Sequence, residues 1–251
     1  MTHRADLTRA SAVVALAWAL VGCAGTPPPR TLDKSTPVSR TAAQTTANPI
    51  AATDPWAGFN RRIYRFNALA DQYVLLPAVH MYHAVTPKLA RKSVGNFLGN
   101  VGEITTFANA VLQLKPMTSL ITLSRFVINS TIGVAGLFDP ATGMGLYQRN
   151  EDFGQTLGRY GVPTGPYLVL PFFGPSNLRD AVGLAGDQTL SFELDPLQIQ
   201  GNRPAEAAYY TAYTLNKRDS LAFRYYQTGS PFEYILVRTV YLNYRALQVD
   251  R

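Results

Sequence analysis

A long uncharged stretch that proline and glycine interrupt constrains the fold of this chain more than any other feature. Within residues 151–180, no charged residue lies between Arg159 and Arg179. A membrane-spanning helix is excluded there, because proline lacks a backbone donor and clashes with the preceding turn. We therefore expect irregular backbone, with at most a short strand at Tyr167–Leu170. The interruptions are Pro163, Pro166, Pro171 and Pro175, with Gly161, Gly165 and Gly174 between them.

Two interpretations of this uncharged stretch fit its residues. It is either a buried loop of a soluble domain, or the wall or lip of a cavity that takes something apolar. Irregular backbone is tolerated at membrane depth only where protein or a water-filled cavity satisfies its polar groups. The choice between the two depends on what the rest of the chain forms.

The composition limits the classes of function. A hydrophobic content of 47% is enough for a folded core, and the formal net charge of +7 favours anionic surfaces such as phospholipid headgroups. No basic run of the kind typical of nucleic-acid binding appears, so we expect no nucleic-acid partner. Because Cys23 is the only cysteine, intramolecular disulfides and cysteine-based zinc sites are excluded.

The first 53 residues predict export and a lipid anchor. Residues 1–22 combine the basic Arg4 and Arg9 with a short apolar core, which is typical of a signal peptide. Residues 20–23, LVGC, resemble the lipobox of bacterial lipoproteins, which predicts lipidation, with palmitate among the acyl chains, at Cys23; the alternative is ordinary secretory cleavage near Ala24. The remainder of 23–53 is rich in Thr, Ala and Pro and predicts a disordered linker.

Residues 54–251 predict a helical domain. Asp54 as N-cap and Pro55 as first helical residue predict a helix that ends near Pro77. Its apolar stripe fits a membrane-interface helix and a helix packed on a core equally well. Further helices are predicted from Thr86 onward, over 104–112 and after Pro116. The glycines of the GxxxG pattern at 95–99 fit either close packing of another helix or a kink or turn. None of the predicted helices contains eighteen uninterrupted apolar residues, so no conventional spanning helix is expected.

Two more helices, at about 204–226 and 231–248, complete the predicted C-terminal helical region of 203–248. They carry a cluster of tyrosines, and such residues are common both at membrane surfaces and in partly buried helix contacts. We expect this region to be a brace that faces the periplasm. The tyrosines are Tyr209, Tyr210, Tyr213, Tyr225, Tyr226, Tyr234, Tyr241 and Tyr244.

No catalytic constellation is apparent, so we expect no enzyme, no metal and no cofactor. His80 and His83 are the only histidine pair, and metal sites usually need three or four ligands. No GxSxG motif supplies a hydrolase nucleophile. The carboxylates near the uncharged stretch are expected to cap helices or to pair with Arg159 and Arg179; they are Glu151, Asp152, Asp180 and Asp187.

Four segments together resemble the MlaA (VacJ) family of outer-membrane lipoproteins. They are residues 59–67 (FNRRIYRFN), 85–97 (VTPKLARKSVGNF), 125–139 (RFVINSTIGVAGLFD) and nearly all of 151–180. The resemblance covers about 54–190, in the expected order and spacing. It implies an all-α fold, a ring-like bundle of amphipathic helices embedded in one membrane leaflet, with the Gly/Pro-rich segment lining a central channel.

The resemblance also implies a function and partners. Such a protein removes mislocalised phospholipid from the outer leaflet of the outer membrane, works with trimeric porins, and passes lipid to a periplasmic carrier, which maintains lipid asymmetry. It is lipid-anchored on the periplasmic side. The alternative is a structural or assembly lipoprotein that scaffolds porins without moving lipid.

The residues expected to act in that function lie in two segments. The segment 139–147 corresponds to a hairpin that gates the channel, with Thr142, Gly143, Met144 and Gly145 at its tip. The residues expected to line the channel and contact lipid are Tyr160, Val162, Tyr167, Leu168, Val169, Leu170, Phe172 and Phe173.

Overall fold

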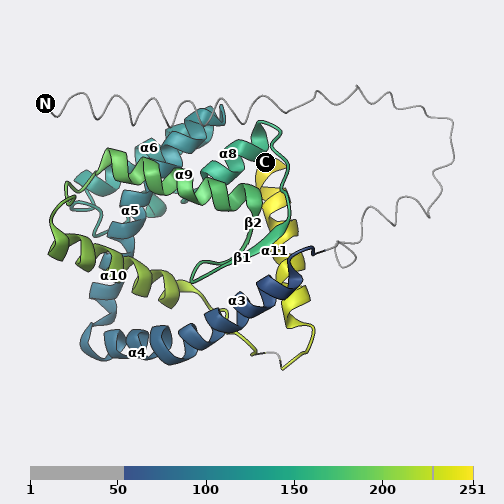
Figure 1. Ribbon diagram of the computed structural model, residues 1–251. Coiled ribbons are helices and arrows are strands. Elements are labelled where there is room, and N and C mark those ends of the chain that lie inside the picture. The colour runs from purple at the N-terminus through teal and green to yellow at the C-terminus, as the bar shows by residue number, and fades with distance from the viewer. Residues whose placement is uncertain (1–53, 228, 251) are drawn as a thin grey trace, which may run out of the picture. The chain divides into compact units, whose positions relative to one another are not determined.

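The computed structural model describes residues 54–227 and 229–250. Contacts divide the chain into two units, 1–47 and 48–251, and all described residues belong to the second. The predicted signal peptide, Cys23 and the predicted linker lie outside the described residues. The described part is mostly helical, which confirms the expected fold class in outline, and it adds one two-stranded sheet (Figure 1).

The N-terminal helical segment continues through the proline that was expected to end it. Helix α3 (Ala57–Ala70) leads into the π-helical turn η1 (Asp71–Leu75) and then into α4 (Leu76–Val85). The wider π turn gives Pro77 a place in the first turn of α4, where its missing N–H leaves no partner unsatisfied. The expected start was also wrong, because Asp54 accepts from the N–H of Trp56 ahead of the helix.

Helix α5 (Lys88–Leu112) is a single helix of 25 residues, which excludes a break at the GxxxG pattern and shows that the expected separate helix over 104–112 was wrong. The asparagines beside its glycines do not break it, because they bond to other elements. Asn100, for example, donates to Oγ of Ser130 at 2.9 Å. Gly95 admits a neighbouring helix, since a Cβ there would lie 2.9 Å from Nδ2 of Asn216.

Helix α6 (Pro116–Thr131) begins at the predicted proline and packs extensively on α5. After it comes the single helical turn α7 (Pro140–Gly143), whose N-cap Asp139 accepts from the N–H of Thr142 at 3.1 Å. The segment expected to form a gating hairpin therefore contains a helical turn and a following loop.

The uncharged stretch contains the predicted strand and more regular structure than expected. Strand β1 (Tyr167–Leu170) pairs antiparallel with β2 (Gly174–Asn177), with Leu168 opposite Ser176. The expectation of irregular backbone between Arg159 and Arg179, with at most one short strand, missed β2; the helices α8 (Phe153–Arg159) and α9 (Leu178–Leu194) flank this run. Asp152 and Asn177 cap these two helices, which pack on each other.

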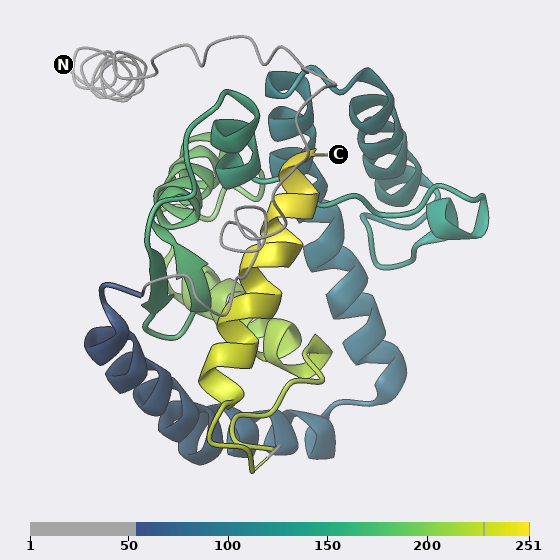
Figure 2. The same ribbon diagram turned by 90° about the vertical axis from the view of Figure 1, so that its right-hand side faces the viewer.

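The last two helices are α10 (Arg203–Ser220) and α11 (Glu233–Asp250). α10 ends six residues before the predicted Tyr226, and the chain then runs through turns to α11. α11 contacts both α8 and β2, and Figure 2 shows it in yellow across the centre of the view. None of the described helices is long and apolar enough to cross a membrane.

Candidate functional site

The interior of the described domain is unusually polar. Among the described residues, buried polar and charged side chains outnumber buried apolar ones, the reverse of what a water-soluble domain shows. Asn60, Asn109, Thr122 and Asn177 have no exposed surface at all. Such an interior is stable only where the buried groups satisfy one another's hydrogen bonds.

The exterior carries the apolar side chains that the interior lacks. Large hydrophobic residues are exposed on every long helix and at the turn of the β-hairpin, and contiguous exposed apolar surface marks contact with lipid or another protein. The exposed residues include Phe66, Tyr73, Met81, Leu89, Leu120, Phe172, Phe173, Phe232 and Leu247.

Two asparagines of α3 hold the edge of the β-hairpin. Asn60 donates to the carbonyl of Tyr167 at 3.0 Å and accepts from the N–H of Val169 at 2.9 Å. One heptad later, Asn67 donates to the carbonyl of Leu170 at 2.9 Å and accepts from the N–H of Phe172 at 2.8 Å. The helix thereby supplies the partners that a third strand would supply, and the edge of β1 needs no water.

A tyrosine cluster packs beneath this hairpin. Tyr64 makes edge-to-face contacts with Tyr225, Tyr226 and Tyr234, with ring centroids 5.0, 5.7 and 5.8 Å away. The hydroxyl of Tyr64 donates to Oε1 of Glu233 at 2.7 Å. Burial and that carboxylate raise the pKa of Tyr64, so its hydroxyl remains a donor at any physiological pH.

An ion network joins the signature segment, residues 151–180, to α11. Arg245 donates from Nη1 and Nη2 to the carboxylate of Asp152 and from Nε to Asp180, and Asp180 also accepts from Arg179 and Tyr241. Burial alone would raise the pKa of each carboxyl, but the bonds and charge of Arg245 outweigh it and hold both pKa values below the ordinary value. Both carboxylates are therefore ionised and paired.

A second network fixes the segment around α7. Arg125 of α6 donates from Nε to Glu103 at 2.6 Å, and from Nη1 to Oγ1 of Thr142 at 3.0 Å and to the carbonyl of Leu146. Its Nη2 reaches Oδ2 of Asp139 at 3.3 Å. Burial raises the pKa of Glu103 in spite of the arginine. One guanidinium thus ties α5, α6 and the loop after α7 together.

Two ion pairs join the N-terminal part of the domain to α10 and α11. The hydroxyl of Tyr234 and the guanidinium of Arg238 lie beside the carboxylate of Asp54. The carboxylate of Asp71, in the π turn, accepts two hydrogen bonds from Arg218 of α10. These contacts join residues more than a hundred positions apart in the sequence.

The predicted channel residues divide into three groups by burial. Tyr167 and Val169 are buried in the tyrosine cluster, which makes them core residues. Val162, Leu168 and Leu170 are half-buried. Three are exposed, namely Tyr160, Phe172 and Phe173, and the hydroxyl of Tyr160 donates to the carbonyl of Leu112 at 2.6 Å.

The predicted gating residues lie together at the end of α7 and in its turn. Thr142, Gly143, Met144 and Gly145 are all exposed, and Gly145 has a positive φ of 85° that favours glycine. Thr142 is the residue that both Asp139 and Arg125 hold. The movement of this segment stays a prediction.

Sequence reasoning missed the residues that organise the site. Asn60, Asn67, Arg125 and Arg245 were not singled out as site residues, because the partners of their side chains lie far away in the sequence. Carboxylates near the uncharged stretch cap helices and form ion pairs, as predicted. Asp180 pairs with the expected Arg179, but Asp152 pairs with Arg245. No group of three potential metal ligands occurs among the described residues.

Comparisons with known proteins agree on one family. A model of the MlaA lipoprotein family matches residues 52–248. An uncharacterized protein of Rickettsia bellii is 36% identical over 165 residues, which cover 66% of this chain and 64% of the relative. The intermembrane phospholipid transport system lipoprotein MlaA of Escherichia coli is 36% identical over 197 residues, or 75% of each chain.

A solved structure extends the agreement to the fold. It is described as "Structural basis for maintenance of bacterial outer membrane lipid asymmetry", and it matches with a TM-score of 0.65 at 30% identity. The match covers 78% of this chain and 99% of that chain. The chain spans slightly less than two thirds of the length of the Rickettsia relative, but the family match extends over nearly the whole described domain. The chain therefore belongs to the MlaA lipoprotein family.

Proposed function

We propose that this protein is an outer-membrane lipoprotein that removes phospholipid from the outer leaflet and passes it toward the periplasm, which maintains lipid asymmetry. The observation that carries the proposal is the inverted distribution of polarity, with polar side chains inside and large apolar ones outside. A lipid that crosses half a bilayer needs a polar path for its headgroup, and the protein around that path needs an apolar surface toward the acyl chains.

The order in which the elements pack supports a ring. α4 contacts α10, α10 contacts α5, α5 contacts α8, and α8 contacts α11. α11 contacts β2, and β1 contacts α3, which continues into α4 and completes the circuit (Figure 1). We propose that this circuit surrounds a channel, with Leu168 and Leu170 on its wall, because they lie on the face of β1 opposite the buried Tyr167 and Val169.

The relatives suggest how the proposed protein works with others. The Escherichia coli relative is named as part of an intermembrane phospholipid transport system. By family likeness we propose trimeric porins as membrane partners and a periplasmic lipid carrier as the acceptor. No bond is made or broken, so transfer follows the lipid gradient and the affinity of the acceptor.

The deciding experiment measures phospholipid at the cell surface. In a strain that lacks the protein, an acyl-transfer reporter that acts only on outer-leaflet phospholipid should give a raised signal, and expression of the full chain should restore it. If the signal does not change while porin level or assembly does, the proposal is wrong and a porin scaffold takes its place.

The lipid anchor needs a separate test. We propose that Cys23 is the lipidated residue, on the basis of the LVGC sequence before it. Labelled palmitate should be incorporated into the full chain and not into the Cys23→Ala variant. Incorporation into the variant at the same level would place the acyl chains elsewhere.

A further inference from the structure

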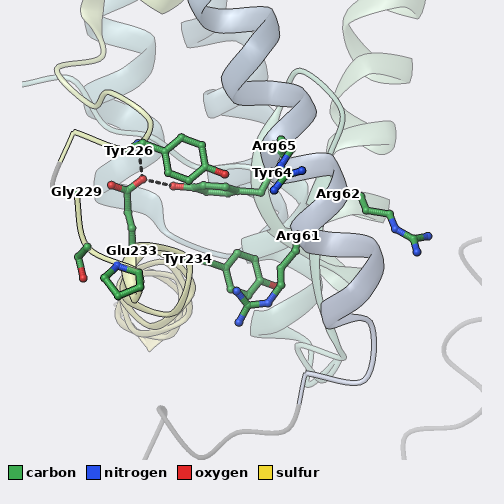
Figure 3. A pocket seen from close by; sticks show the side chains of 10 residues that line it. Arg61, Arg62, Tyr64, Arg65, Tyr226, Gly229, Glu233 and Tyr234 are labelled. Atoms are coloured by element: carbon green, nitrogen blue, oxygen red, sulfur yellow. Dashed lines mark hydrogen bonds between the residues drawn. The ribbon is translucent and has the colours of Figure 1, made fainter.

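A cavity of about 660 Å³ opens between α3 and the start of α11. Figure 3 shows its lining, with Tyr226, Gly229 and Glu233 on the side of α11 and the loop before it, and with Arg61, Tyr64 and Arg65 extending from α3. Leu168 and Leu170 of the β-hairpin are not among its lining residues. The cavity is lined by Arg61, Arg62, Tyr64, Arg65, Tyr226, Gly229, Ser230, Pro231, Glu233 and Tyr234.

The charge of this lining is strongly unbalanced. The lining residues include three arginines and one carboxylate, Glu233, which already accepts hydrogen bonds from the hydroxyl of Tyr64 and the N–H of Tyr226. Within residues 54–227 and 229–250, none of the three guanidinium groups makes an ion pair. Their positive charge is therefore available to an incoming anion.

One of the arginines is already oriented. The guanidinium carbon of Arg61 lies 4.5 Å from the centroid of the Tyr234 ring, a cation–π contact that restricts its rotamers. Arg65 stands one helical turn further on, beside Tyr64, whereas Figure 3 shows Arg62 directed away from the cavity. Two guanidinium groups on one edge of a helix match a tetrahedral oxyanion, whose oxygens accept paired N–H donors.

The two cavity arginines lie at a boundary on α3. The face of α3 with Asn60, Tyr64 and Ala68 is buried, and the face with Phe59 and Phe66 is apolar and exposed. At 100° per residue, Arg61 and Arg65 project from the edge of the buried face that is remote from Phe59 and Phe66, where α3 meets the cavity.

We propose that this cavity binds a phosphate group, as carried by a phospholipid headgroup or by free phosphate, at a site separate from the transport path. Arg61 and Arg65 hold the phosphate oxygens, and Tyr234 keeps Arg61 in place. The inference goes beyond the proposed function, because the site can bind phosphate whether or not the protein moves lipid.

The test titrates the full chain, held in an uncharged maltoside detergent, and measures heat by calorimetry. The probes are glycerophosphoglycerol, which is the headgroup of phosphatidylglycerol without acyl chains, inorganic phosphate, dihexanoyl phosphatidylglycerol and uncharged glycerol. We expect the phosphate-bearing probes to bind and glycerol not to bind. The double variant R61A/R65A should weaken phosphate binding by about tenfold or more.

The matched control is Arg62→Ala, which removes the same charge from the same helix and leaves Arg61 and Arg65 in place. It should keep binding within about twofold, because a general charge effect in water is small. Since all three arginines are exposed, the variants should keep the helical circular-dichroism spectrum of the wild type. The pair R61K/R65K, which keeps the charge and loses the guanidinium fork, should fall between wild type and the double alanine variant.

The outcomes separate the sources of phosphate. Tighter binding of dihexanoyl phosphatidylglycerol than of inorganic phosphate supports a lipid site, and equal binding supports a site for free phosphate. Absence of binding by all phosphate-bearing probes overturns the proposal, and so does an equal loss in Arg62→Ala. None of these results depends on the surface-phospholipid measurement that tests the proposed function.

Discussion

Nε of Arg245, on the last helix, lies 2.7 Å from Oδ2 of Asp180, at the end of the signature segment. The same guanidinium also bonds to both oxygens of Asp152. Because the side chains of Asp180 and Arg245 are almost completely buried, water cannot solvate either charged group when the other is removed. The stability of the signature segment should depend on this one residue of α11.

Arg245→Leu should lower the free energy of unfolding by about 3–5 kcal/mol, because it removes the buried cation that Asp152 and Asp180 share and leaves Arg179 as the basic partner of Asp180. The measurement is chemical denaturation of the full chain in an uncharged detergent. Arg224→Leu is the control, since Arg224 is exposed, and should change stability by about 0.5 kcal/mol or less. Equal effects of the two substitutions would contradict the assigned role of Arg245.

The loss of stability that Arg245→Leu causes should become smaller at acidic pH. Burial would raise the pKa values of Asp152 and Asp180, but Arg245 holds them below the ordinary 3.8 in the folded state. Stability from a depressed pKa is present above the unfolded value and is lost as pH falls through the folded value. Thermal unfolding of wild type and variant should therefore differ at pH 7 and converge below about pH 3.8. A difference that stays constant down to pH 2 would show that the two carboxylates do not cause it.

Asn60→Ala should destabilise the protein by about 2–6 kcal/mol, because it leaves the carbonyl of Tyr167 and the N–H of Val169 buried without partners, at about 1–3 kcal/mol each. Asn243→Ala is the matched control, since that exposed side chain bonds only within its own helix. Denaturation midpoints of the two variants provide the comparison. An effect of Asn60→Ala no larger than that of Asn243→Ala would mean that water replaces the amide at the strand edge.

Arg125→Lys should loosen the segment around α7 without unfolding the domain. Lysine keeps a charge beside Glu103 but cannot reach Thr142 and the carbonyl of Leu146 at the same time. Backbone amides of 142–146 should exchange with deuterium about tenfold faster or more, as expected when a local opening loses a charged hydrogen bond. Arg149→Lys, on an exposed residue of the same loop, should leave exchange unchanged. Unaltered amide exchange in Arg125→Lys would show that Arg125 does not hold this segment in place.

Leu168→Asp should abolish transport activity, whereas Leu168→Asn should retain part of it. The two side chains have nearly the same size, so the comparison isolates a negative charge on the proposed wall, which would repel lipid phosphate. The readout is surface phospholipid in cells that produce each variant at wild-type level. Full activity of Leu168→Asp would exclude this face of β1 from the lipid path.

The helices and the short strand could be predicted because both depend on residues that are close together in the sequence. Proline and apolar periodicity placed α6 and β1 correctly. The prediction that the helix ends near Pro77 was wrong because the preceding π turn accommodates this proline. That turn depends on the surrounding helix and cannot be recognised from the proline alone. The helices on either side of the uncharged stretch begin where Asp152 and Asn177 cap them.

The candidate site was less predictable, because it consists of pairs that are distant in the sequence. Nothing near Asn60 shows that a strand edge more than a hundred residues later requires its amide. Nothing near Asp152 indicates Arg245, so the nearer Arg159 and Arg179 were the natural partners to expect. Two residues that were predicted to line the channel, Tyr167 and Val169, are buried and belong to the core instead.

The contacts between the two ends of the domain also govern when it can fold. Asp54 meets a tyrosine 180 residues later, and Asp71 meets an arginine 147 residues later. A nascent chain cannot form either contact until nearly all of it has been made, and contacts at such separations slow folding. A chain truncated before α11 would leave Asp54, Asp152 and Asp180 without their basic or hydroxyl partners from α11. Loss of the final helix should therefore affect the whole domain, and we expect premature stop mutations even late in the gene to behave as complete losses.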